Sequence, residues 1–120
     1  SGQLIVETIG ISGFSECVGE IRLRLSLLRY GSASESWVVR NQVYLPKRSN
    51  TANPTWRSYR ELSPSYLTGD VINVEILKHG SRISPKMDTT FASGIVSLEQ
   101  LIEAQYTPVS FPLLVESPRE

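Results

Sequence analysis

The amino-acid sequence predicts an all-β fold, an antiparallel β-sandwich of about seven or eight strands with one short connecting helix. Val, Ile, Thr and Ser are frequent and only four Ala are present, which favours strands over helices. Apolar and polar residues alternate in the segment Glu20–Leu27, as expected for a strand with one buried face. Turn-rich segments separate the apolar runs, and no strand–helix–strand alternation occurs, so a doubly wound nucleotide-binding fold is not expected.

Seven segments are predicted as strands because each is rich in alternating apolar, β-branched or aromatic residues. They are Leu4–Ile9, Glu20–Leu27, Trp37–Leu45, Trp56–Leu62, Asp70–Leu77, Phe91–Val96 and Val109–Val115. The polar turn Gly31–Ser36 joins the second strand to the third, and the long loops Pro46–Pro54 and Lys78–Thr89 join later strands. The third strand alternates less cleanly than the second.

One or two helical turns are predicted between the last two strands. The segment Ser97–Gln100 has the form of a capping box, with Ser97 as the N-cap and Gln100 three residues later. Leu98, Leu101 and Ile102 then recur on one helical face, so we expect the helix to pack over the sandwich edge.

Composition excludes several classes of function. The length of 120 residues predicts a single domain over residues 1–120. We expect this domain to be excised from a larger protein. Lys and Arg number 12 and Asp and Glu number 12, so no basic surplus is available for nucleic acid. Cys17 and His79 are the only residues of their kinds, which argues against a disulfide, a zinc site and nucleophilic catalysis. We therefore expect no cofactor and no enzymatic activity.

Several short motifs together resemble a C2 domain. The turn Asn53–Trp56 resembles the family's N-P-x-[WF] turn, in which the aromatic side chain packs between the sheets. Gly19–Leu25 lies where the family has a D-P-Y-V-K-V strand, and Phe91–Leu98 resembles its I-G-x-x-x-V-x-L strand. Three further segments resemble other parts of the family pattern: Gln3–Glu7, Ser65–Ile76 and Phe111–Leu114. An immunoglobulin-like or fibronectin-like sandwich is the alternative.

The chain departs from the calcium-binding members of that family. Their Asp ligands lie in two loops at one end, but the first such loop here, Ile11–Gly19, has no Asp. The second loop begins Leu77–Arg82 and offers only Asp88. A single carboxylate does not satisfy an ion that takes six to eight oxygen ligands. We expect no calcium binding.

The resemblance implies a calcium-independent interaction module, and docking to an unidentified protein partner is the leading interpretation. Such domains occur in cytoplasmic scaffold, centrosomal, ciliary and signalling proteins. Exposed aromatic residues are the candidate anchors, because Trp and Tyr concentrate interface energy. The candidates are Trp37, Tyr44, Tyr59 and Tyr66.

The alternative interpretation is calcium-independent binding of phosphoinositide or another anionic phospholipid, which would make the chain peripheral to a membrane. Lys78, His79, Arg82 and Lys86 would form a basic rim, and Phe14 an apolar tip. Arg22 and Arg24, on the polar face of the second strand, are further candidates for a headgroup, although pairing with Glu side chains is the simpler expectation.

Overall fold

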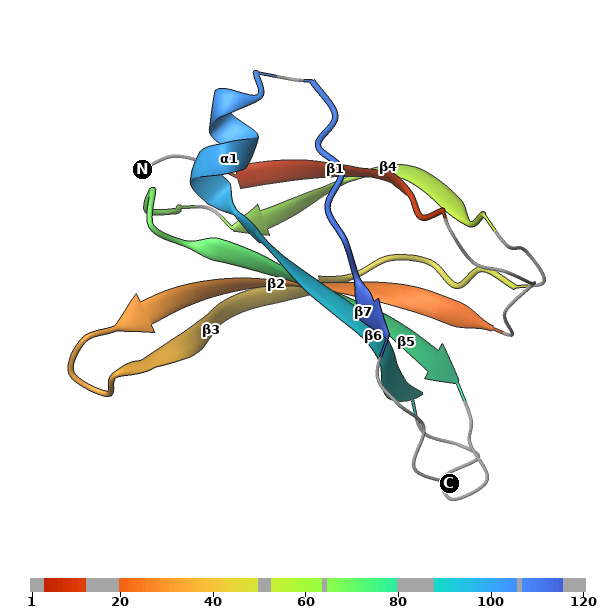
Figure 1. Ribbon diagram of the computed structural model, residues 1–120, viewed down its shortest axis with the longest axis horizontal. Helices are drawn as coiled ribbons and strands as arrows, with labels where there is room; N and C mark the ends of the chain where they lie inside the picture. The colour runs from red at the N-terminus through yellow and green to blue at the C-terminus, as the bar shows by residue number, and fades with distance from the viewer. Residues whose placement is uncertain are drawn as a thin grey trace.

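The computed structural model describes residues 4–12, 20–49, 53–63, 65–79, 88–105 and 107–115. These residues form seven strands and one short helix, so the all-β class is confirmed (Figure 1). In chain order the elements are β1 (Leu4–Gly10), β2 (Ile21–Gly31), β3 (Ser36–Tyr44), β4 (Thr55–Ser63), β5 (Val71–His79), β6 (Asp88–Ser97), α1 (Leu98–Glu103) and β7 (Leu114–Val115).

The strands form two sheets, and all strand pairs are antiparallel. One sheet has five strands in the order β3-β2-β5-β6-β7, and the other has two, β1 and β4. Figure 1 shows the β1–β4 pair lying as a separate layer above the strongly twisted larger sheet. In the described part of the chain, β3 and β7 are therefore the edge strands of the larger sheet.

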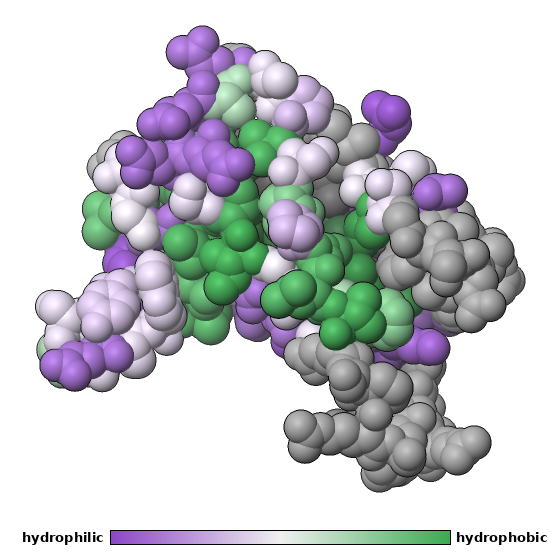
Figure 2. Space-filling view, viewed as in Figure 1, coloured by the Kyte–Doolittle hydropathy of each residue, from purple (hydrophilic) through white to green (hydrophobic). Residues whose placement is uncertain are grey.

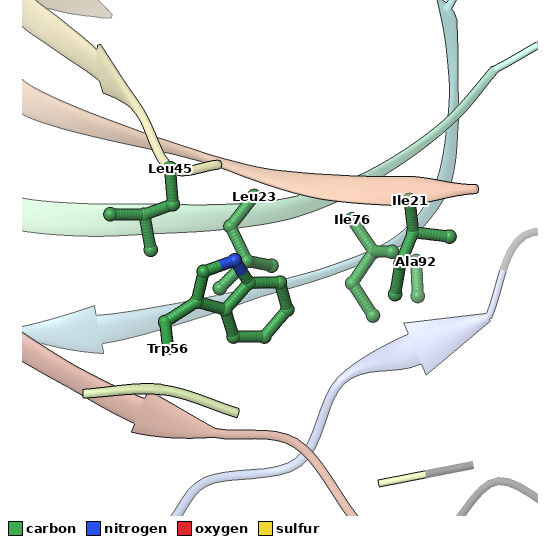
Figure 3. Close-up of a cluster of buried hydrophobic side chains, with 6 residues drawn as sticks. All are labelled: Ile21, Leu23, Leu45, Trp56, Ile76 and Ala92. Atoms are coloured by element: carbon green, nitrogen blue, oxygen red, sulfur yellow. The ribbon is translucent and has the colours of Figure 1, made fainter. Parts of the chain in front are cut away.

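The core lies between these two layers. In β2 the alternation predicted from the sequence is realised, since Ile21, Leu23, Leu25 and Leu27 are each at most 2% exposed. Trp56 of β4 packs on Ile21 and Leu23 in one buried cluster, and Figure 3 shows its ring pointing toward the side chains of the larger sheet. A second cluster joins Leu62 of β4 to Leu25 and Leu27. Each such buried side chain contributes roughly 1.5–3 kcal/mol by leaving water.

The last strand is shorter than the sequence predicts. The expected strand Val109–Val115 contains Pro112, which has no N–H to donate to a strand ladder. Only Leu114 and Val115 pair with β6. The preceding segment passes close over Gly94, where a Cβ atom would lie 2.6 Å from the carbonyl oxygen of Pro112, so a glycine is needed there.

The connecting helix begins as predicted. The hydroxyl of Ser97 accepts a hydrogen bond from the amide of Gln100 at 3.1 Å, which caps α1. Leu98 is buried, whereas Ile102 is exposed, so only part of the predicted apolar face packs on the sheet. In the described part of the chain, no helix has the length and apolar character needed to cross a membrane.

Candidate protein-interaction site

The two arginines considered for headgroup binding are both paired with carboxylates. Arg22 contacts Asp88 at 2.9 Å, and Arg24 makes two hydrogen bonds to Glu75, at 2.9 and 2.8 Å. Thr90 donates a third hydrogen bond to Glu75. The hydrogen bonds from Arg24 outweigh the desolvation of Glu75, and the pKa of Glu75 is therefore lowered from its ordinary value. These pairs cancel the charge that an anionic headgroup would need.

The basic rim is described only in small part. The Lys78 side chain is half-buried, with its ammonium 5.7 Å from the centre of the Phe91 ring. His79 ends β5, but its side chain lies outside what the structure describes, as do Phe14, Arg82 and Lys86.

The four aromatic candidates are not brought together. Trp37 and Tyr44 lie at the two ends of β3 and are 48% and 44% exposed. Tyr59, on β4 in the other layer, is 65% exposed. Tyr66 is half-buried and packs against the cluster around Leu62, which favours a structural role.

The tip of the β2–β3 hairpin carries a group of exposed apolar side chains. Trp37, Val38 and Val39 are consecutive and are all more than 40% exposed. Tyr30, on β2, is half exposed and meets the Trp37 ring edge to face, with the ring centres 5.6 Å apart. The hairpin projects from the body of the molecule at the lower left of Figure 1, and Figure 2 shows it as a separate arm.

The two faces of this hairpin are set by the strand register. Trp37 lies opposite Tyr30, and Val39 lies opposite Leu28, so these side chains share one face. Val38 lies opposite Arg29 on the other face. Within the described part of the chain, Trp37 and Val39 on one face and Val38 on the other are all largely exposed, which explains the weak alternation of the third strand in the sequence.

A β-bulge divides β3 into a half that is tied to the other layer and a half that projects beyond it. The register shifts between Leu27 and Leu28 because Arg40 is an extra residue, a β-bulge. Beyond it, the Asn41 side chain donates a hydrogen bond to the carbonyl of Leu62 on β4, which ties this half to the other layer. The residues Ser36–Arg40 remain, and we call them the free edge. Among the described residues no strand pairs with their outer side.

The projecting hairpin is attached to the core by a buried carboxylate. Asp70, 1% exposed, accepts two hydrogen bonds from the Arg29 guanidinium, both 2.9 Å, and one from the amide of Leu67. Burial by itself would raise the pKa of Asp70, but these donors outweigh it and the pKa lies below its ordinary value. The backbone carbonyl of Asp70 also accepts from Leu98 at the start of α1.

Sequence reasoning selected Trp37 but missed its neighbours Tyr30, Val38 and Val39. The signal that would have found them is the consecutive apolar run in a strand with poor alternation, since such a strand places apolar side chains on both faces. Asp70 was also not selected. No described group of three or more His, Cys, Asp or Glu residues is arranged to hold a metal ion.

The larger apolar surface in Figure 2 lies in the middle of the molecule, where Figure 1 places β6 and β7. On these two strands Ile95, Leu114 and Val115 are each more than 60% exposed, but the register places Ile95 and Leu114 on one face of the sheet and Val115 on the other. The β7 edge is two residues long, so it offers far less backbone for pairing than the free edge.

Comparisons of this chain with protein-family models, with curated proteins and with solved structures found no match.

Proposed function

We propose that this chain is a non-catalytic, calcium-independent docking module of C2-like sandwich type, which binds a protein partner within a larger intracellular scaffold or signalling protein. The observation that carries the proposal is the free edge, where Trp37, Val38 and Val39 are exposed and no strand in the described part of the chain pairs with the outer side.

An exposed edge strand is a template for another strand. Natural edge strands are protected by Lys, by Pro, by charged side chains that point inward or by β-bulges, and among these devices the free edge has the bulge at Arg40. The free edge has one charged residue, Arg40, at its end. A partner strand added here would gain affinity from main-chain hydrogen bonds and specificity from side chains that alternate between the two faces.

The C2-like assignment is supported by the environment of Trp56. The resemblance implies that the aromatic residue of the Asn53–Trp56 turn packs between the sheets, and Trp56 is 5% exposed in the cluster between the layers. Calcium independence is proposed from the sequence, because the loops that would hold the ion lack Asp.

Membrane binding has less support than protein docking. The ion pairs of Arg22 and Arg24 satisfy two of its candidate residues internally. Of the remaining candidates, only the Lys78 side chain lies within the described residues, and it is half-buried beside the Phe91 ring.

The test is capture of binding proteins on the immobilised chain, with a matched pair of variants. Trp37→Lys alters the hairpin, and Tyr59→Lys alters an aromatic residue in the other layer that is more exposed than Trp37. We expect one set of captured proteins to be lost with Trp37→Lys and retained with Tyr59→Lys. A set that both variants retain would refute docking at the hairpin. Co-sedimentation with phosphoinositide vesicles in chelator is expected to be absent, and salt-sensitive binding there would favour the lipid alternative.

A further inference from the structure

We infer that Ser32, in the turn of the projecting hairpin, is a phosphorylation site for a protein kinase that recognises acidic residues, and that a phosphate there weakens docking at the free edge. The phosphorylation itself depends only on the turn, whereas its effect on docking rests on the proposed function.

The turn presents serine hydroxyl groups at the end of the hairpin. The residues Ser32–Glu35 join β2 to β3, and all four are exposed at the far end of the arm in Figure 1. The Ser34 hydroxyl donates to the carbonyl of Gly31 at 3.3 Å and accepts from the Ser36 hydroxyl at 3.0 Å. Among the described residues, no partner binds the Ser32 hydroxyl. Ser32 is therefore the turn residue whose hydroxyl is available for reaction.

The charges near Ser32 in the sequence fit two classes of kinase. Arg29 lies three residues before Ser32 and Glu35 lies three residues after it. Kinases select substrates by the pattern of charges around the acceptor hydroxyl, and some recognise basic residues whereas others recognise acidic ones. The sequence alone therefore does not choose between a basic-directed and an acid-directed kinase.

The structure separates these two classes. The Arg29 guanidinium donates two hydrogen bonds of 2.9 Å to the buried carboxylate of Asp70, so a kinase that bound Arg29 would have to break this ion pair. Glu35 is exposed and forms no ion pair with another residue in the described part of the chain. The acidic residue is thus the one that a kinase can bind without disturbing the fold.

The fold also distinguishes Ser32 from a second serine with the same spacing. Ser58 lies three residues before Glu61, but it is within β4 and pairs with Thr8 of β1, so a kinase would have to separate two strands to reach it. The turn at Ser32 buries no side chain and can open without loss of core contacts. Glu35 has a left-handed φ of 53°, which is unfavourable for a residue with a Cβ atom, so opening the turn also relieves strain.

The reaction is transfer of the γ-phosphoryl group of ATP, which the kinase binds with Mg²⁺. The Ser32 hydroxyl oxygen forms a bond to the γ-phosphorus while the bond from that phosphorus to the β-phosphate oxygen breaks. ADP leaves, and the hydroxyl proton passes to a base of the kinase.

A phosphate on Ser32 would oppose docking because of its position. Ser32 follows Gly31, which lies opposite Ser36, the first residue of the free edge. The phosphate adds a charge of about −1.5 to −2 at pH 7, next to the negative charge of Glu35. A partner strand that covers the apolar side chains of the free edge would have to remove water from this charge, which is costly.

The first test is incubation of the whole chain with ATP, Mg²⁺ and a purified acid-directed kinase, followed by mass spectrometry that locates the phosphate. We expect phosphate on Ser32 and none on Ser58. Ser32→Ala should lose this phosphate, and Ser34→Ala is the matched control that should keep it. Glu35→Gln should slow modification of Ser32 about tenfold or more, because it removes a charged hydrogen-bonding group. A basic-directed kinase should leave Ser32 unmodified.

The second test repeats the capture of binding proteins with kinase-treated chains. The phosphorylated wild type should capture about tenfold less of the set that Trp37→Lys loses, whereas kinase-treated Ser32→Ala should capture the full amount. Because Ser32→Ala controls for phosphate elsewhere in the chain, the difference between the two reports on Ser32 alone.

The outcomes separate the inference from the proposed function. Absence of phosphate on Ser32, or an unchanged rate in Glu35→Gln, would overturn the site. Phosphate placed on Ser32 by the basic-directed kinase would overturn the role assigned to the Arg29 ion pair. If Ser32 is phosphorylated but capture is unchanged, the effect on docking is wrong and the site stands. If Trp37→Lys itself retains the captured set, the docking function fails while the phosphorylation result remains.

Discussion

The two tryptophans of this chain lie in opposite environments. Trp56 is 5% exposed, packs between the two sheets and donates its indole N–H to the carbonyl of Pro46 at 2.7 Å. Trp37 is 48% exposed, and its ring contacts Tyr30 at the tip of the projecting hairpin. Both residues are on strands, so their local conformation does not explain the contrast.

The difference comes from whether a second layer lies over the strand. β4 belongs to the smaller sheet, and its inward side chains are covered by β2, β5 and β6. The hairpin extends past that cover, so its apolar side chains are left available for another molecule. The same residue type therefore stabilises the fold at one position and offers a binding surface at the other.

The largest expected effect tests this contrast directly. Trp56→Ala should lower the free energy of unfolding by about 3–5 kcal/mol, because it removes a buried ring and leaves a cavity. Trp37→Ala should lower it by less than about 1 kcal/mol, as for most exposed positions. Urea unfolding followed by far-ultraviolet circular dichroism measures both values. Equal losses in the two variants would show that the hairpin is part of the core.

The next effect concerns the attachment of the hairpin to the core. Asp70→Asn should lower the free energy of unfolding at pH 7 by about 2 kcal/mol, since a hydrogen bond to a buried charged group contributes about 1.5–3 kcal/mol. The pKa of Asp70 in the folded state lies below its ordinary value of 3.8. The Asp70 carboxylate therefore stabilises the fold fully at pH values above 3.8, and this contribution is lost as the pH falls through the pKa of the folded state.

The pH dependence of the two proteins is the check on that explanation. The stability difference between wild type and Asp70→Asn should stay constant from pH 7 to about 5 and shrink below the ordinary pKa. The pKa of Glu75 is also lowered, so protonation of Glu75 lowers the free energy of unfolding of both proteins in acid. The Asp70→Asn variant is therefore still expected to lose stability at low pH. If the stability difference between wild type and Asp70→Asn is the same at pH 7 and at pH 2, the negative charge of Asp70 does not contribute to stability.

The smallest effect tests the boundary between the half of β3 that is tied to the other layer and the half that projects beyond it. Asn41→Ala removes the hydrogen bond to the carbonyl of Leu62 and should cost about 1 kcal/mol. It should also speed amide hydrogen exchange in the second half of β3 while leaving exchange of the hairpin tip unchanged. Gln42→Ala is the control, because the Gln42 side chain donates to Ser26 within the same sheet. Faster exchange across the whole hairpin in Asn41→Ala would contradict a boundary at this residue.

Much of the fold was predictable because strand formation depends on local patterns. The alternation around Leu23 identified β2 and its buried face, and the polar turn after Gly31 predicted where the hairpin reverses. The strand at the C-terminal end was predicted too long, because the pattern of apolar residues around Pro112 outweighed its missing N–H in that prediction.

The candidate site was predictable only in part. Trp37 was selected as an aromatic anchor, but Tyr44, Tyr59 and Tyr66 were selected on the same ground and lie elsewhere. An aromatic side chain can anchor an interface only where it is exposed. Its exposure depends on whether the other sheet covers the strand that carries it. The free edge, from Ser36 to Arg40, required knowledge of strand order, since a strand has a free edge only when it ends a sheet.

The sequence by itself determined which segments become strands, where the helix is capped and which face of β2 is apolar. These properties arise from residues within a few positions of each other. The tertiary structure decided which tryptophan is buried and where the free edge lies. It also brought Arg22 to Asp88, 66 residues away in the chain, and Arg24 to Glu75, 51 residues away. Such contacts depend on how distant strands are ordered and twisted, and local residue patterns do not specify that order.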